Sequence, residues 1–355
     1  MNTNVTRSRI YYLDVLRAIA CMCVVMIHCS VLYSAEEVYL GSANYLAGLI
    51  FEGISRLGVP VFVMISGALL LDEDRDAGFA KTRGHILRMI LFFIFWSAVY
   101  CLVFQVADPV LKNEPVRLSG VGAALITGPV HLWYIYFIIG IYLIVPLLRL
   151  WVKKDNIKYV GYFILLAFVF QSVLANLTEI GLMYHDAFRH FDYILGSGLR
   201  LSYVSGLTVY FVLGWYLNNR EFKRPALIYI LGAASLLVMI GGSYAIGVTK
   251  DTCQRPLYAR LSPFVFMWSV SVFVFVKRAF KNAEENRFIL AVSRLSLGIY
   301  AVHPMLITLL FTRFLQPLLP DAALLNIPLM YITVFALSCA VSYLLGRIPG
   351  LKRLV

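Results

Sequence analysis

Ionisable side chains lie inside the apolar segments of this sequence, where they are uncommon. Asp14, Arg17 and His28 fall within the first apolar run, residues 11–33. A charge in hydrocarbon is costly, so residues of this kind commonly mark sites of chemistry. On a helix, Arg17 and His28 share a face about 16 Å apart, and Asp14 precedes Arg17 by one turn and can pair with it. An imidazole titrates near neutral pH, so His28 can act as a base. The alternative is a structural histidine with an Arg17 that snorkels to the interface.

The second apolar run carries Glu52 and Arg56, four residues apart. Side chains at this spacing can form an ion pair on one helix face. Pro60 has no N–H for the carbonyl of Arg56, so we expect the helix to be interrupted there. The second run crosses the membrane in the direction opposite to the first. Glu52 therefore lies at a depth in the membrane similar to that of His28. A hydrogen bond from His28 to Glu52 and an ion pair that only holds the helices together are both consistent with this pattern.

Four further candidates lie at the ends of predicted helices. Arg83 and Arg88 open the third apolar run, and Arg88 is the deeper of the two, which favours it as an anion-binding residue. Their alternative role is that of ordinary positively charged flanking residues. His131 and Trp133 open the fourth run, where a tryptophan is typical of an interfacial anchor.

The ninth apolar run carries a polar stripe. Ser293, Ser296, Tyr300 and His303 follow one another at intervals of three or four residues, which places them on one helix face. Pro304 removes a backbone hydrogen bond and is expected to kink the helix. The stripe is therefore either a functional surface or a set of polar groups that satisfies a kinked backbone.

Several kinds of catalytic site are not indicated. The sequence has no glycine-rich phosphate loop, no HExxH and no Gly-x-Ser-x-Gly elbow, and Ser66-Gly67 lies inside an apolar run. His185 and His190 in an outer loop lack established ligand spacing, so no metal site is predicted. The cysteines mostly lie inside apolar runs and are expected to be free buried thiols: Cys21, Cys23, Cys29, Cys101, Cys253 and Cys339.

Long apolar helices must position these residues. The chain has 355 residues, of which 61% are hydrophobic and 14% charged, and a soluble protein of this size is not so apolar. Roughly 20 helical residues cross the hydrocarbon layer, and backbone groups in lipid must be paired internally. We therefore predict an all-α integral membrane protein, residues 1–355 forming a single transmembrane domain. About ten spans are expected, at residues 11–33, 44–71, 84–106, 131–151, 157–175, 201–217, 225–246, 260–278, 288–312 and 326–346.

The placement of lysine and arginine predicts the orientation. With a cytoplasmic N-terminus, the segments facing the cytoplasm carry more than twice as many lysines and arginines as the outer loops. This bias favours both termini in the cytoplasm. It also accounts for most of the net charge of +12. The basic residues are spread over alternate loops and do not form one patch, so a nucleic-acid partner is not expected.

Four segments together resemble the bacterial acyltransferase-3 family of membrane O-acyltransferases. The first is Leu13-Asp14-Val15-Leu16-Arg17 with His28, the family's Arg-x10-His pattern. The others are the segment 56–67, which reads RLGVPVFVMISG, His131-Leu132-Trp133-Tyr134 with Pro146 later, and the segment 293–303, which reads SRLSLGIYAVH. Their order covers nearly the whole chain. The overall sequence pattern is most similar to that of the subgroup that includes the enterobacterial common antigen O-acetyltransferase.

The resemblance implies an acyl-CoA donor on the cytoplasmic side and a glycan hydroxyl acceptor at or beyond the outer side. It implies that His28 is catalytic and Arg17 essential. It places the protein in the bacterial inner membrane, among membrane lipids. Acetyl-CoA would be a co-substrate, and no tightly bound cofactor is expected. The acceptor would be a cell-surface glycan or a lipid-linked sugar.

The expected reaction is acyl transfer to a sugar hydroxyl. His28 would take the hydroxyl proton as a general base, and Glu52 would hold the imidazole tautomer. Arg17, with Arg83 or Arg88, would bind the CoA phosphates, while Tyr300, His303 or Ser66 would donate to the oxyanion. Direct attack and an acyl-enzyme relay both remain open. The alternative functions are a glycan or small-molecule transporter, which would move substrate without consuming acyl-CoA, and a structural assembly subunit.

Overall fold

The computed structural model describes residues 9–74, 79–194 and 206–354 of the chain. Within these ranges the ordered elements are all helical, with no strand. This confirms the predicted all-α class. The expected spans are rich in leucine, isoleucine, valine and phenylalanine. In lipid, such segments fold as helices because the helix pairs every interior N–H with a carbonyl of the same segment.

Nine helical stretches of the described chain are long and apolar enough to cross a membrane. They correspond to nine of the ten expected spans, so this is a multi-pass membrane protein. The remaining expected span, residues 201–217, falls partly outside the described residues. Its second half is the helix α11 (Thr208–Asn218). The nine stretches are Tyr11–Ser34, Ala43–Leu70, Lys81–Leu111, Leu118–Trp151, Lys154–Leu182, Ala226–Lys250, Pro256–Phe280, Arg287–Leu315 and Ala323–Leu345.

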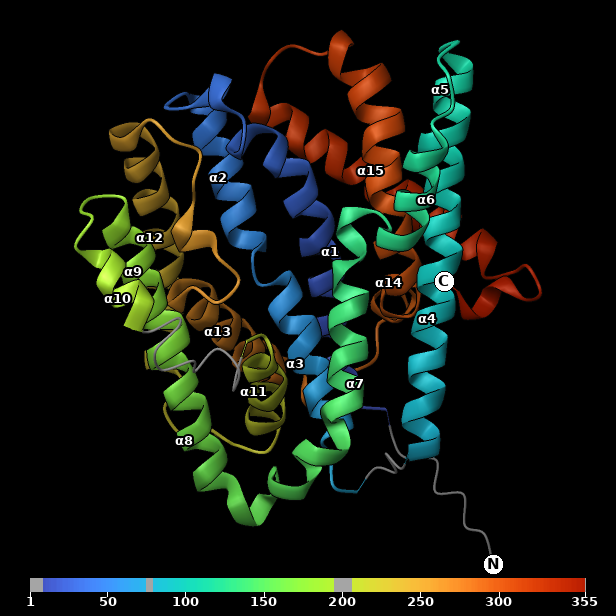
Figure 1. Ribbon diagram of the computed structural model, residues 1–355. Coiled ribbons are helices and arrows are strands. Elements are labelled where there is room, and N and C mark those ends of the chain that lie inside the picture. Colours follow the sequence, from blue (N-terminus) through green and yellow to red (C-terminus); the bar gives the residue numbers. More distant parts are fainter. Residues whose placement is uncertain (1–8, 75–78, 195–205, 355) are drawn as a thin grey trace, which may run out of the picture. The chain divides into compact units, whose positions relative to one another are not determined.

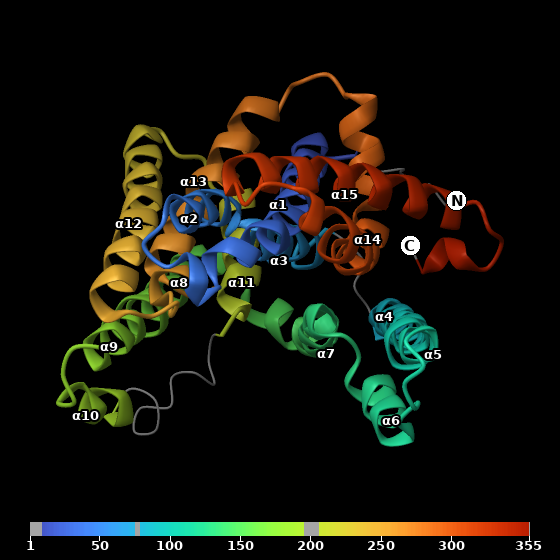
Figure 2. The same ribbon diagram turned by 90° about the horizontal axis from the view of Figure 1, so that it is seen from above.

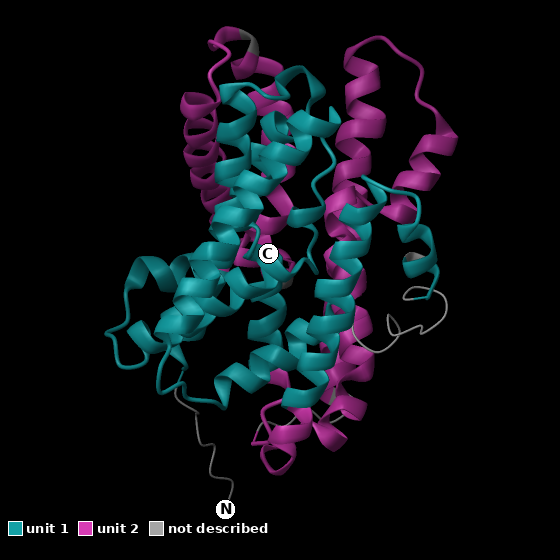
Figure 3. Ribbon diagram, turned by 90° about the vertical axis from the view of Figure 1, so that its left-hand side faces the viewer, with its two compact units in different colours: residues 1–68, 161–294 teal, residues 69–160, 295–355 magenta. Residues whose placement is uncertain are grey.

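The chain separates into two compact units, residues 1–68 with 161–294 and residues 69–160 with 295–355 (Figure 3). The first unit holds α1 (Tyr11–Ser34), α2 (Ala43–Ser55), most of α3 (Gly58–Leu70) and of α8 (Ile157–Ala167), α9 (Ala175–Leu182), α10 (Phe188–Asp192), α11, α12 (Ala226–Lys250) and α13 (Pro263–Phe280). The second holds α4 (Phe79–Cys101), α5 (Asp108–Leu111), α6 (Leu118–Thr127), α7 (Trp133–Trp151) and α15 (Ala323–Leu345). Helix α14 (Arg287–Leu306) begins in the first unit and ends in the second.

Helix pairs organise each unit. In the first unit α2 lies alongside α1 and α12 alongside α13 (Figure 1). In the second unit α4 packs against α6 and α7, and Figure 2 shows the three helices from above. The α1–α2 pair matters most for the site, because both helices carry ionisable residues toward each other.

The second apolar run is broken, as Pro60 predicts. Helix α2 begins after Ser42, whose hydroxyl accepts a hydrogen bond from the backbone N–H of Tyr45 at 3.1 Å. It ends at Ser55, and α3 restarts at Gly58. Pro60 has no N–H to offer the carbonyl of Arg56, so the continuous hydrogen-bond ladder stops there. The break places Arg56 at a helix end instead of in a helix interior.

Two glycines lock α3 against α11. A Cβ at Gly67 would overlap the carbonyl of Phe211, and a Cβ at Gly214 would overlap the carbonyl of Met64. Helices in membranes associate through such small residues, which let the two backbones approach closely. The contact is reciprocal, so each helix supplies one glycine to the other's backbone.

Replacing Gly67 with alanine is expected to destabilise the first unit by about 3 kcal/mol, because the obstructing atoms are backbone and cannot swing aside. Gly140→Ala is the matched control, since Gly140 lies in the interior of α7 with open space around its Cα. Thermal unfolding followed by size-exclusion chromatography in detergent measures both. A Gly67→Ala protein as stable as the control would contradict the interlocked packing.

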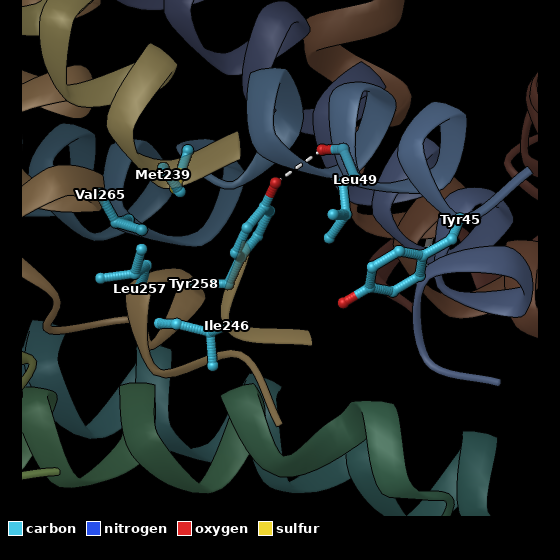
Figure 4. Packing of buried hydrophobic residues seen from close by; sticks show 7 residues of the cluster. All are labelled: Tyr45, Leu49, Met239, Ile246, Leu257, Tyr258 and Val265. Carbon is cyan, nitrogen blue, oxygen red and sulfur yellow. Dashed lines mark hydrogen bonds between the residues drawn. The ribbon is translucent and has the colours of Figure 1, made fainter. Parts of the chain in front are cut away.

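A buried cluster supports the end of the first unit that carries Glu52. Leu49 and Tyr45 of α2 pack with Met239 and Ile246 of α12 and with Leu257, Tyr258 and Val265 (Figure 4). The hydroxyl of Tyr258 donates to the carbonyl of Leu49 at 2.7 Å, which satisfies the polar end of a buried aromatic ring. This contact fixes the segment 256–258 against α2, and with it the residues on either side.

Candidate active site

Glu52 is the centre of a buried charge cluster in the first unit. Its carboxylate is fully buried. One oxygen accepts from Arg56, one turn along the same run, and the other accepts from Arg255 and from the hydroxyl of Ser34. Arg255 also donates to Ser34 at 2.5 Å. The predicted Glu52–Arg56 ion pair is therefore present. Two cations around one buried carboxylate give it the partners that a buried charge needs.

Close helix packing brings the members of this cluster together. Ser34 is the last residue of α1, while Glu52 lies in α2. A Cβ at Gly48 would come within 2.8 Å of the Ser34 nitrogen, so only glycine lets α2 approach α1 this closely. Arg255 arrives from the short connection between α12 and α13, just before the anchored Tyr258.

His28 lies near the same cluster. It is half-buried on α1, and the charges of Arg56 and Glu52 both act on its imidazole. The structure thus brings His28, Glu52 and Arg56 into one region, as their depths in the membrane predicted. The hydrogen bonds that the structure gives Glu52 go to Arg56, Arg255 and Ser34. A tautomer-holding role for Glu52 stays a prediction.

A second polar cluster surrounds Arg17 at the other end of α1. Asp14 is buried and accepts from Arg17 at 3.1 Å, from Arg9 at 3.0 Å and from the Ser293 hydroxyl at 2.6 Å. Arg17 also donates to Ser293 at 3.2 Å. The predicted Asp14–Arg17 pair is present. Because Asp14 holds one of its nitrogens, the Arg17 guanidinium is oriented and still partly exposed.

The second unit assembles its own group of predicted residues. The Tyr300 hydroxyl donates to the carbonyl of His131, and the rings of His131 and His303 lie 6.1 Å apart. His303 is fully buried, and its Nδ1 lies 3.0 Å from the carbonyl of Ile299. The hydroxyl of Tyr100, from α4, donates to the carbonyl of Ala301 at 2.9 Å. The end of the polar stripe on α14 therefore faces the start of α7.

Four further predicted site residues lie on α3, α4 and α7. Arg83 and Arg88 are exposed on α4. Trp133 packs at right angles to the ring of Tyr134, as suits an interfacial anchor. The hydroxyl of Ser66 donates to the carbonyl of Phe62 at 3.0 Å, within its own helix. No group of metal-ligating residues occurs among those that the structure describes.

A family model, described as an acyltransferase domain, matches residues 10–347. The chain belongs to the acyltransferase-3 family. The match covers all four segments that carry the resemblance, from Asp14 to His303. No curated protein and no solved structure gives a significant match. The protein is therefore a membrane acyltransferase. The two clusters on α1 are its candidate active site.

The acyltransferase has a pocket next to the Glu52 cluster. It has a volume of about 400 Å³ and belongs entirely to the first unit. It is lined by Arg56, Glu179, Cys253, Gln254, Arg255, Tyr258, Ala259 and Arg260. Tyr258 forms part of the wall, with the Arg56 guanidinium 5.5 Å from its ring centre. A pocket of this volume holds a small-molecule ligand or part of a larger one.

Sequence reasoning missed the contributions of Arg255, Arg260 and Ser34. In the sequence, Arg255 and Arg260 contribute only to the count of basic residues in the outer loops. A signal was available, because arginine is disfavoured on the outer side by the same charge bias that predicts the topology. Ser34 gave no signal, because a serine at a helix end is common.

Cys253 offers a probe of this pocket. Burial raises the pKa of the Cys253 thiol, against the lowering effect of Arg255. The thiolate is the reactive form, so at neutral pH we expect Cys253 to react with a maleimide more slowly than an exposed cysteine does. The rate should keep rising above the pH at which an exposed thiol levels off. The control is an exposed cysteine made by Ser119→Cys in a Cys253→Ser background, and equal pH profiles would contradict the prediction.

Proposed function

We propose that this acyltransferase moves an acyl group, in the first instance acetyl, from acyl-CoA to a hydroxyl of a cell-surface glycan or lipid-linked sugar. His28 is the general base. The observation that carries the proposal is the position of a half-buried imidazole beside the Glu52–Arg56–Arg255 cluster, on the same helix as an oriented Arg17. Family membership supplies the reaction class.

The reaction balances as a direct transfer. Neutral His28 takes the proton of the acceptor hydroxyl as its oxygen attacks the thioester carbonyl. The tetrahedral intermediate collapses, the C–S bond breaks, and the CoA thiolate receives the proton from the imidazolium. Products are the sugar ester and CoA. A base requires the neutral form of the imidazole, whose free nitrogen takes the proton.

Arg17 is the residue that binds the acyl-CoA donor in this proposal. Both termini are taken as cytoplasmic, so the Asp14–Arg17 cluster faces the cytosol and binds a phosphate of CoA. The pantetheine arm then follows α1 toward His28, a distance of about 16 Å. Arg83 and Arg88 on α4 are proposed as further phosphate ligands. Tyr300, His303 and Ser66 stay candidates for the oxyanion donor.

The remaining features of the proposal follow from the resemblance. The protein acts in the bacterial inner membrane and resembles the enterobacterial common antigen O-acetyltransferase subgroup. Its substrates are acetyl-CoA, used as a co-substrate without a tightly bound cofactor, and a glycan reached from the outer side. A lipid-linked sugar is a suitable acceptor because it can enter a membrane-buried site sideways.

The test is transfer of radiolabelled acetyl from acetyl-CoA to candidate glycans by the purified protein in nanodiscs. We expect acceptor-dependent label in the glycan and one equivalent of CoA released. Rapid quenching without acceptor separates direct attack from an acyl-enzyme relay. Movement of a glycan across the bilayer with no consumption of acyl-CoA would overturn the proposal in favour of transport.

A further inference from the structure

We propose that the pocket lined by Arg56, Arg255 and Arg260 binds a negatively charged group of the acceptor, a phosphate or a carboxylate. The inference rests on the proposed function in one respect, because it takes the ligand to be the molecule that receives the acyl group. The presence of an anion site in this pocket rests on the structure alone.

The lining of the pocket is rich in arginine. Three guanidinium groups meet two carboxylates there: the buried Glu52 beneath Arg56 and Arg255, and the exposed Glu179. Arg260 is exposed at the opening. Arg56, Arg255 and Arg260 thus line one pocket. Arginine is suited to this task because its planar fork matches the oxygens of phosphate and carboxylate.

The two inner arginines also keep hydrogen-bond donors for a ligand. Within the described chain, Arg56 bonds to Glu52 through one terminal nitrogen, and its buried Nε–H has no hydrogen-bond acceptor. Among the residues that the structure describes, Arg255 bonds to Glu52 and Ser34 through Nη1. A guanidinium has five N–H donors, so several from these two residues remain. A buried donor without an acceptor is costly, and an anionic oxygen in the pocket would remove that cost.

The location favours the acceptor over the donor as the source of this anion. The pocket lies at the His28 end of α1, and the CoA phosphates are assigned to Arg17, about 16 Å along the same helix. The connection that carries Arg255 is predicted to face the outer side. Arg56 acts electrostatically on His28, so an anion held by Arg56 brings the rest of its molecule close to the base. A volume of about 400 Å³ accommodates a charged sugar as well as a lone ion.

Protection of Cys253 tests the site without relying on activity. Cys253 lines the pocket, so a bound anion should slow its reaction with a maleimide. The full-length protein in phosphatidylcholine nanodiscs is labelled at pH 9 with increasing inorganic pyrophosphate or glucose 6-phosphate, and with neutral glucose as a blank. We expect both anions, but not glucose, to protect. Arg260→Gln should raise the half-protecting concentration roughly tenfold, as loss of one charge-assisted contact does.

Arg117→Gln is the matched control, an exposed arginine of the other unit that is also predicted to face outside. It should leave protection unchanged. Absence of protection by either anion, or equal protection in Arg260→Gln and the unsubstituted protein, would overturn the anion site. The donor is tested with acetyl-CoA and acetyl-dephospho-CoA. Protection by acetyl-CoA at lower concentration than glucose 6-phosphate, lost with the dephospho form, would assign the pocket to CoA and overturn the proposal.

The acyl-transfer assay keeps this inference separate from the proposed function. If pyrophosphate protects Cys253 but no acyl transfer is ever detected, the anion site stands and the proposed function fails. If acetyl transfer proceeds and no anion protects, the proposed function stands and the anion site fails.

Discussion

Replacing His28 with alanine is expected to lower acyl transfer by about a hundredfold to ten-thousandfold, the usual contribution of a general base. The loss should appear in the turnover rate, and the Michaelis constant for acyl-CoA should change little. His28 lies beside Arg56 and Glu52, and an imidazole is the side chain whose ordinary pKa lies nearest neutral pH. The measurement is steady-state transfer from acetyl-CoA by purified protein.

Two companion variants separate a catalytic loss from a folding defect. His28→Asn keeps a polar side chain of similar length and should be as inactive as His28→Ala. Lys223→Ala changes an exposed residue in the connection between α11 and α12 and should be fully active. All three proteins must elute as the unsubstituted protein does in size-exclusion chromatography. A folded His28→Ala protein with full transfer activity would remove the histidine from the mechanism.

Replacing Glu52 with glutamine is expected to destabilise the protein by about 3 kcal/mol, the scale seen when one partner of a buried ion pair is removed. The substitution keeps the shape of the side chain. It leaves Arg56 and Arg255 facing each other without the negative charge between them. Thermal unfolding in detergent measures the change in the free energy of unfolding, and acyl transfer should fall in parallel.

A double-substitution cycle makes this prediction specific to the charge cluster. Ser34→Ala removes one hydrogen bond to Glu52 and should cost only about 1 kcal/mol. Arg255→Leu combined with Glu52→Gln removes a cation together with the anion, so the pair should be less destabilising than the sum of the single changes. Additive effects of Glu52 and Arg255 would show that the ion pair contributes nothing to stability.

The sequence by itself determined the helical class, most of the spans and the contacts between neighbours on one helix. The Asp14–Arg17 and Glu52–Arg56 pairs follow from spacings of three and four residues. Pro60 predicts the break that separates α2 from α3. The family motifs added the reaction class, because their order along the chain is more specific than any one of them. These are local or linear features, and periodicity reports them directly.

Only the tertiary structure decided which helices meet. Arg255 reaches Glu52 across 203 positions of sequence, Ser293 reaches Asp14 across 279, and Tyr300 reaches His131 across 169. In a soluble protein a polar stripe marks the outside of a helix, but in a membrane the lipid-facing and protein-facing residues are both apolar. Hydropathy therefore finds the spans without revealing which faces pack together. The packing of these faces depends on small residues such as Gly48, Gly67 and Gly214. Their role is visible only in the tertiary structure, where a second backbone lies against each of them.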